Sequence, residues 1–188
     1  MMLAHIDALD ATLAELSDKI REQMRPFEDA LERLDTIPGV GRRIAELVVA
    51  ELGTDLRRFP TAGHLASWAG LCPGHDESAG KRRSGKTRKG NRSLRWALIE
   101  AAQAAGRSRE TYLAAQFHRL AVRLGKKKAT VAVAHGILVV AYHLLTRPDV
   151  YADLGGDYSD RRDQEIIEHR LVRRLAALGN KVTLETVS

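Results

Sequence analysis

The sequence predicts an all-α fold: a helix-hairpin-helix-containing helical domain with an N-terminal coiled-coil arm. Hydrophobic residues make up 44% of the chain but aromatic residues only 5%, so the core is built mainly from Ala, Leu, Val and Ile. Such a composition favours helices. Apolar residues recur at helical spacing, whereas the alternation typical of strands is scarce, and we therefore expect no strand.

The N-terminal segment carries an apolar stripe whose members follow one another at intervals of three or four residues, from Leu3 to Leu34. This spacing is typical of a coiled-coil seam or a helical hairpin, and Pro26 interrupts the helix or begins a second one. Two interpretations remain open. The helix either packs on its own domain, or it forms a homodimer or higher oligomer through residues 1–34. We assign 1–33 as a coiled-coil connector.

A helix-hairpin-helix pattern follows, in which Ile37-Pro38-Gly39-Val40-Gly41 separates two short apolar segments. Glycines permit a tight turn and a close approach of phosphate, and the first amides of the second helix form an anion site. We expect DNA backbone contacts from four residues here: Gly39, Gly41, Arg42 and Arg43. The alternative is a structural corner that binds nothing.

The remaining elements follow from caps and apolar periodicity. Thr61 caps a short helix, and a basic loop then fills 74–90. Further helices are expected at about 91–106, 108–124, 126–145 and 161–178. We therefore place a helix-hairpin-helix domain at 34–146, and a C-terminal loop and amphipathic helix at 147–188. The apolar segment 129–145 is short for a membrane span and predicts a buried core helix with no membrane partner.

Charge is concentrated in the middle of the chain. Residues 39–130 hold nineteen Lys or Arg against seven Asp or Glu, and the sequence pI is near 9.7. Both features indicate a polyanionic partner such as DNA. The single cysteine, Cys72, excludes an internal disulfide and fits a reducing, cytoplasmic and nucleoid-associated location.

The basic loop is the sharpest candidate site, because the stretch from Ser78 to Arg95 holds eight Lys or Arg and no acid. A mobile loop of this kind could hold a serine hydroxyl against a phosphate while its cations stabilise the developing charge. By local chemistry alone, a surface serine is more often inert, and the loop then only clamps phosphates. The segment Gly80–Thr87 matches the spacing GxxxxGKT, but no buried strand precedes it, so we do not expect nucleotide binding.

Histidine and cysteine offer weaker candidates. Cys72 and His75 lack a second pair of ligands, so no metal site is expected in this chain. His135 and His143 are interpreted as core or interface residues.

Several ordered blocks together resemble a known family: IPGVG followed by AELVVAELG, then RFPTAGHLASWAGLCPG, GNRSLRWALIEAA, LAVRLGKKKATVAVAHGILVVAYHLL and YADLGGDY. The chain is similar to the C-terminal domain of an insertion-sequence transposase family, the serine-containing relatives of the Piv-type DNA invertases, some of which are bridge-RNA-guided recombinases. The resemblance implies that Ser78, with Ser84 as the fallback, attacks DNA and becomes covalently linked to it.

The same resemblance implies a partner for that serine. An N-terminal RuvC-like domain of the family holds Mg²⁺ through four acidic residues, and no such half is recognisable here, so we expect no cofactor in this chain and no activity from it alone. DNA, and a structured guide RNA in some members, are the implied partners. Beyond the hairpin glycines and arginines, we expect DNA contacts from Lys81, Arg82, Arg83, Lys86, Arg88, Lys89, Asn91, Arg95, Lys126, Lys127 and Lys128. For the three consecutive lysines, a solvated helix start is the alternative.

Overall fold

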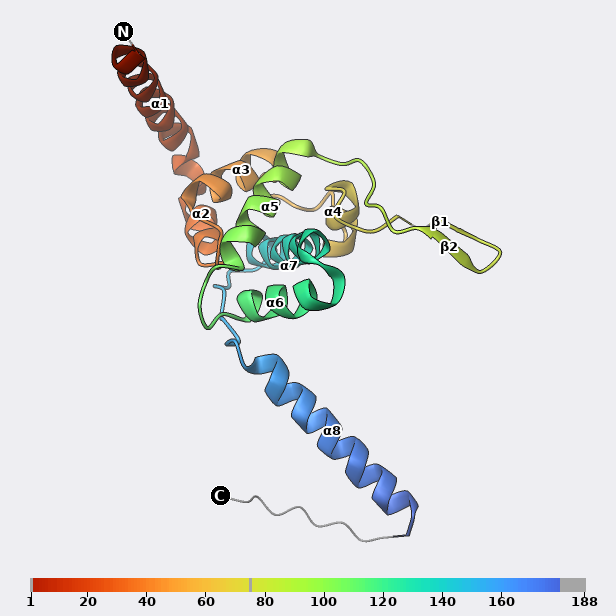
Figure 1. The fold of residues 1–188 in the computed structure, drawn as a ribbon. Coiled ribbons are helices and arrows are strands. Elements are labelled where there is room, and N and C mark those ends of the chain that lie inside the picture. Colours follow the sequence, from red (N-terminus) through yellow and green to blue (C-terminus); the bar gives the residue numbers. More distant parts are fainter. Residues whose placement is uncertain (1, 75, 180–188) are drawn as a thin grey trace.

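The computed structural model describes residues 2–74 and 76–179, without the side chains of Met2, residues 76–78 and 82–84, Asp163 and Glu165. Helices dominate it (Figure 1). The elements are α1 (Met2–Met24), a 3-10 turn η1 (Arg25–Phe27), α2 (Glu28–Asp35), α3 (Arg42–Leu52), α4 (Ala62–Trp68), β1 (Asp76–Ser78), β2 (Lys81–Ser84), α5 (Arg92–Ala105), α6 (Tyr112–Leu124), α7 (Lys126–Thr146) and α8 (Tyr158–Ala177). The all-α class is confirmed.

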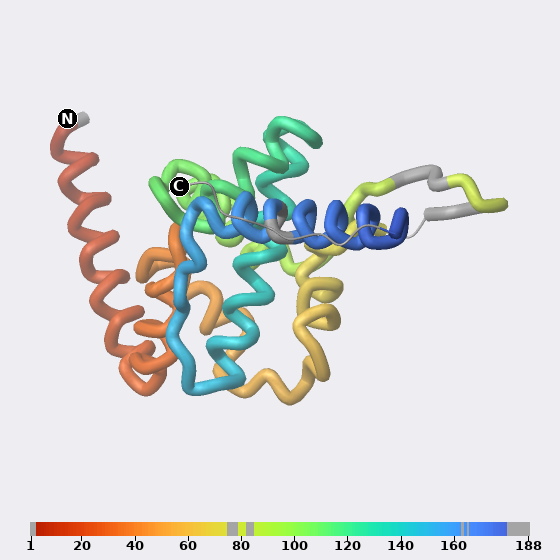
Figure 2. The backbone as a smooth tube through the Cα atoms, turned by 90° about the horizontal axis from the view of Figure 1, so that it is seen from below, coloured from red at the N-terminus to blue at the C-terminus, as the bar shows by residue number. Residues whose placement is uncertain are grey.

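Helix α7 is the centre of the body formed by α2 to α7, where it contacts α2, α4, α5 and α6. Figure 2 shows it running between the other helices. Val133, Ile137 and Leu138 on α7 are fully buried. By length and composition alone, α7 is the one helix of the described residues that could cross a membrane. Its buried face instead fills the core of this body, as the sequence predicted.

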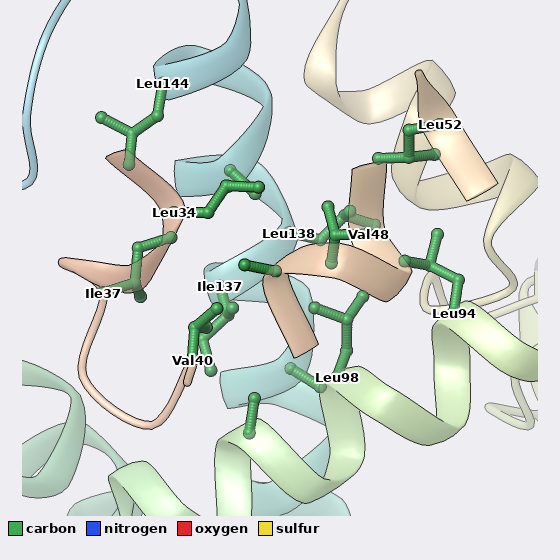
Figure 3. Packing of buried hydrophobic residues seen from close by; sticks show 14 of the residues in the cluster. Leu34, Ile37, Val40, Val48, Leu52, Leu94, Leu98, Ile137, Leu138 and Leu144 are labelled. Atoms are coloured by element: carbon green, nitrogen blue, oxygen red, sulfur yellow. The ribbon is translucent and has the colours of Figure 1, made fainter. Parts of the chain in front are cut away.

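Small residues on α5 let the other helices approach it closely. Ala97, Ala101, Ala102 and Ala105 are all fully buried. Helix α3 packs on this helix, and Val48 of α3 lies near Leu98 of α5 in the core (Figure 3). Because the alanine side chain ends at Cβ, these residues leave room for the backbone of a neighbouring segment.

The two terminal helices project from this body in different directions (Figure 1). On α1 the apolar stripe Leu3, Ile6, Leu9, Leu13, Leu16 and Ile20 is exposed, from 36% to 76% of each residue. The interpretation in which the stripe packs on its own domain is therefore wrong for α1, whereas Leu31 and Leu34 of α2, at the end of the same stripe, are buried in the core. Pro26 lies in the 3-10 turn that separates α1 from α2. Helix α8 also exposes apolar residues, including Ile167, Leu171 and Leu175.

Most helix boundaries agree with the sequence, since Thr61, Asn91 and Thr111 cap α4, α5 and α6 through side-chain oxygens. The expectation of no strand is wrong at one place, because β1 and β2 pair as an antiparallel hairpin inside the basic loop. Its turn residues explain it: Ala79 and Gly80 both have positive φ, 52° and 72°. Two such residues in succession match the twist of a hairpin. The basic loop thus contains an antiparallel hairpin, which Figure 1 shows projecting from the body.

Candidate nucleic-acid interface

The basic hairpin, residues 71–90, carries the predicted serine next to its turn. Ser78 ends β1 and pairs with Lys81 across the turn, whereas Ser84 ends β2 and pairs with Asp76. The register is irregular between Asp76 and Glu77. The two candidate serines therefore lie at opposite ends of the ladder. Their side chains, like those of Arg82 and Arg83, are outside the described residues.

The base of the basic hairpin is held by backbone contacts. Pro73 and Thr87 form an isolated antiparallel bridge, and the Gly74 amide donates to the Lys86 carbonyl at 2.9 Å. Below them the two chain segments cross so closely that a Cβ placed on Gly90 would lie 2.4 Å from the Gly70 nitrogen. Only glycine fits such a crossing. The arm is thus fixed where it leaves the body.

Side chains of α5 complete this clamp. The Arg95 guanidinium donates to the Gly70 carbonyl at 2.7 Å. The Asn91 carboxamide oxygen accepts from the Leu94 amide at 2.9 Å, which caps α5, while its nitrogen donates to Glu51 at 2.6 Å. Asn91 and Arg95 were predicted to contact DNA. The structure places both in internal contacts that hold the basic hairpin against the body.

The cations of the basic hairpin with described side chains are exposed. Lys81 lies at the tip, and Lys86, Arg88 and Lys89 follow in the segment between β2 and α5. A row of exposed cations on a projecting arm is the arrangement expected for contacts to a phosphate backbone. Of the predicted set from Lys81 to Lys89, the side chains of Lys81, Lys86, Arg88 and Lys89 are described, and all four are exposed.

The turn between α2 and α3 was expected to bring phosphate to Gly39 and Gly41. Gly39 has a φ of +86°, and a Cβ there would lie 2.3 Å from the Ala101 carbonyl oxygen of α5. Its face is therefore covered by the Ala-rich surface of α5. Gly41, the N-cap of α3, has open space around its Cα instead. These two glycines, two residues apart, lie in opposite environments.

The two arginines that follow also differ. Arg42 is half-buried and forms a bidentate ion pair with Glu28 and a second pair with Glu46 at 3.1 Å. Hydrogen bonding to Glu28 raises the pKa of Arg42, and the same bond lowers the pKa of the Glu28 carboxyl. Arg42 therefore ties α2 to α3. Arg43 is exposed, and within the part of the chain that the structure describes its guanidinium donates only to the Ser17 hydroxyl, at 3.3 Å.

An open groove of about 1070 Å³ lies between the base of the basic hairpin and the start of α7. We call it the α7 groove. Three lysines line it, Lys86, Lys127 and Lys128, and no acid is among its lining residues. The other lining residues are Leu71, Pro73, Gly85, Thr87, Leu124, Val131, Ala132 and His135. Lys126, the first of the three consecutive lysines, does not line it.

The sequence predicted Lys127 and Lys128 but none of the apolar residues of the α7 groove. Leu124 ends α6, whereas Val131 and His135 lie one and two turns beyond Lys127 on α7. The only signal available was the spacing of 127, 131 and 135, which places these three residues on one helix face. His135 is half-buried in the groove and His143 is exposed elsewhere on α7.

A magnesium site does not fit the residues that the structure describes. Nowhere in 2–74 or 76–179, as far as side chains are described, do three or more His, Cys, Asp or Glu residues gather as metal ligands would. His75, considered at the sequence level with Cys72, lies outside the described residues. We therefore derive no catalytic step through a metal from this chain.

Comparison with known proteins gives two matches. Residues 31–119 match the model of the Transposase IS116/IS110/IS902 family. Over 106 residues the chain is 35% identical to the "Insertion element IS110 uncharacterized 43.6 kDa protein" of Streptomyces coelicolor (strain ATCC BAA-471 / A3(2) / M145). That alignment covers 50% of this chain and 26% of the relative. The aligned part of the chain thus spans about a quarter of the relative's length.

Proposed function

We propose that the chain, whose residues 31–119 match the model of the Transposase IS116/IS110/IS902 family, binds DNA and supplies the serine nucleophile of a transposase or recombinase. The observation that carries the proposal is the basic hairpin. Ser78 lies beside its turn, exposed cations lie at Lys81 and in the segment between β2 and α5, and a backbone crossing at Gly70 and Gly90 fixes its base.

The proposed chemistry uses the serine as a covalent carrier of a DNA strand. The Ser78 Oγ attacks a backbone phosphorus, the Oγ–P bond forms, and the P–O bond to the leaving deoxyribose oxygen breaks. The leaving oxygen takes up a proton, and the phosphoserine ester retains the bond energy that a second strand hydroxyl uses to rejoin. Lys81 and the cations behind it stabilise the charge on the phosphate oxygens.

This activity needs a partner domain. We propose that a RuvC-like domain with four acidic residues supplies Mg²⁺, as the family resemblance implies, and that the chain by itself does not cleave DNA. A structured guide RNA would be a second polyanion for the same cationic surface. The proposed location of such a complex is the cytoplasm, in association with the nucleoid.

The test compares the two serines of the basic hairpin. Ser78→Ala and Ser84→Ala are matched changes at opposite ends of one ladder. Each variant is combined with a RuvC-like partner domain, Mg²⁺ and a nicked DNA substrate that traps covalent intermediates. We expect protein–DNA adducts with wild type and Ser84→Ala, and none with Ser78→Ala. Adducts that persist in Ser78→Ala but disappear in Ser84→Ala would identify Ser84 as the nucleophile. Adducts in both variants would show that neither serine of the basic hairpin is the nucleophile.

A second candidate function is a non-catalytic helix-hairpin-helix module for nucleic-acid binding and dimerisation. The observation that favours it is the exposed stripe of α1, six apolar side chains that the body leaves uncovered. A stripe of this length is unusual on a monomer. We propose that α1 forms a coiled coil with a second copy. Light scattering should show a dimer for wild type and a monomer for Leu9→Glu combined with Leu13→Glu, and a monomeric wild type would contradict it.

A further inference from the structure

We propose that the α7 groove binds an unpaired segment of a nucleic-acid strand. The proposal rests on the proposed function and deepens it, because it names the form of nucleic acid that one part of the surface accepts. We expect duplex DNA to bind the exposed cations of the basic hairpin instead. The two surfaces are adjacent, since Gly85, Lys86 and Thr87 belong to both.

The residues that line the groove can contact both the phosphates and the bases of a single strand. Lys127 and Lys128 supply charges for phosphates, and Leu124, Val131 and Ala132 supply apolar contacts. Base faces are covered by stacking in a duplex and become available only when a strand is unpaired. A groove lined by both lysines and apolar residues therefore has more to contact in a single strand than in a duplex.

The charge of the groove supports the same ligand. Three lysines and no Asp or Glu are among its described lining residues. Lys86 belongs both to the basic hairpin and to the lining of the groove. A strand bound along the basic hairpin can therefore continue into the groove.

The chain offers matched control residues for each feature. Leu124 is 41% exposed and lines the groove, whereas Val122, two residues away on α6, is 92% exposed and does not. Lys127 lines the groove, whereas its neighbour Lys126 does not. We compare Leu124→Ser with Val122→Ser, and Lys127→Gln with Lys126→Gln, in the full 188-residue chain. Thermal unfolding of each variant shows whether it remains folded.

The probe is a fluorescent oligodeoxythymidylate of about 12 nucleotides, a length within the range that single-strand sites occupy. Its affinity is measured by anisotropy beside that of a duplex of equal length and of the corresponding oligouridylate. We expect Leu124→Ser to weaken single-strand binding about tenfold, since an apolar contact is lost, and Lys127→Gln to lower its salt slope by about 0.7. The duplex affinity of Leu124→Ser and both affinities of Val122→Ser should stay near wild type. Lys126→Gln should lower the single-strand salt slope less than Lys127→Gln does, because Lys126 does not line the groove. Equal binding of the uridylate and thymidylate would show that the groove takes RNA as well as DNA.

Several outcomes would overturn the proposal. If Leu124→Ser and Val122→Ser have the same effect, or if Lys127→Gln weakens the duplex as much as the single strand, the groove is not a single-strand site. Duplex binding that persists in that case would leave the proposed function intact. A wild-type chain that binds neither probe would overturn both. Binding of an acidic peptide that Leu124→Ser abolishes, with oligonucleotide binding unchanged, would assign the groove to a protein partner instead.

Discussion

Two segments of this molecule have nearly the same sequence signature, glycines beside arginines and lysines, and the fold uses them in opposite ways. In the α2–α3 turn, Gly39 is covered by α5 and Arg42 is paired with two carboxylates. In the basic hairpin, Lys81 and Arg88 are exposed on an arm outside the body. Glycine and cation in sequence therefore predict a phosphate contact only where the fold leaves them uncovered.

The largest effect is expected from Gly39→Ala. An added Cβ would lie 2.3 Å from a backbone oxygen of α5, and the φ of +86° is unfavourable for any L side chain. We expect a loss of about 3 kcal/mol or more in the free energy of unfolding, measured with denaturant. Gly41→Ala is the control, because it meets nothing within 4 Å and its φ is −85°; we expect about 0.5 kcal/mol or less.

The same two variants could also contradict the contrast between the α2–α3 turn and the basic hairpin. Unchanged stability in Gly39→Ala, accompanied by weaker DNA binding, would restore Gly39 as a phosphate-binding glycine. The α2–α3 turn and the basic hairpin would then serve the same purpose.

The position of the basic hairpin depends on the backbone crossing at its base. In Gly90→Ala the new Cβ would lie 2.4 Å from the backbone of Ala69 and Gly70, so the crossing at the base must open. We expect duplex binding to fall about tenfold, because displaced cations no longer meet successive phosphates, and the unfolding free energy to fall by about 2 kcal/mol. Gel shift and denaturant unfolding measure the two. Gly80→Asn, at a turn position that tolerates a left-handed residue, should change neither.

Much of the body could be predicted from sequence because local signals agree there. The cap at Thr61 and the apolar runs predict most of the helices directly, although α6 begins at Tyr112 rather than at 108. The hairpin was missed because its strands are short and charged, acidic in β1 and cationic in β2, and only the turn conformation at Ala79 and Gly80 reveals it. The roles of Asn91, Arg95 and Arg42 were missed for another reason. Their partners Glu51, Gly70 and Glu28 lie 14 to 40 residues away, and no local pattern encodes such pairs.

Arg42 of the α2–α3 turn and Arg88 of the basic hairpin are expected to affect different quantities, the first stability and the second DNA binding. Arg42→Gln should lower the free energy of unfolding by about 0.5–1 kcal/mol, since a partly exposed ion pair is lost, and leave DNA affinity nearly unchanged. Arg88→Gln should leave stability unchanged and lower the salt slope of duplex binding by about 0.9, the value for one phosphate. Denaturant unfolding and a salt titration measure both variants. If Arg42→Gln changes the salt slope as Arg88→Gln does, Arg42 contacts DNA despite its internal partners.

The smallest effect is a dependence of stability on pH. Hydrogen bonding to Arg42 lowers the pKa of Glu28 below its ordinary 4.5. A carboxyl whose pKa is lower in the folded state stabilises the fold at pH values above its unfolded pKa, and this contribution is lost as the pH falls through the folded value. Wild type should therefore exceed Glu28→Gln in unfolding midpoint at neutral pH, and the difference should shrink below about pH 4. Denaturant midpoints measured across the acid range provide the test. A difference that stays constant with pH would mean that the Glu28 contact contributes through packing rather than charge, and the α2–α3 turn would then owe its cohesion to α5 alone.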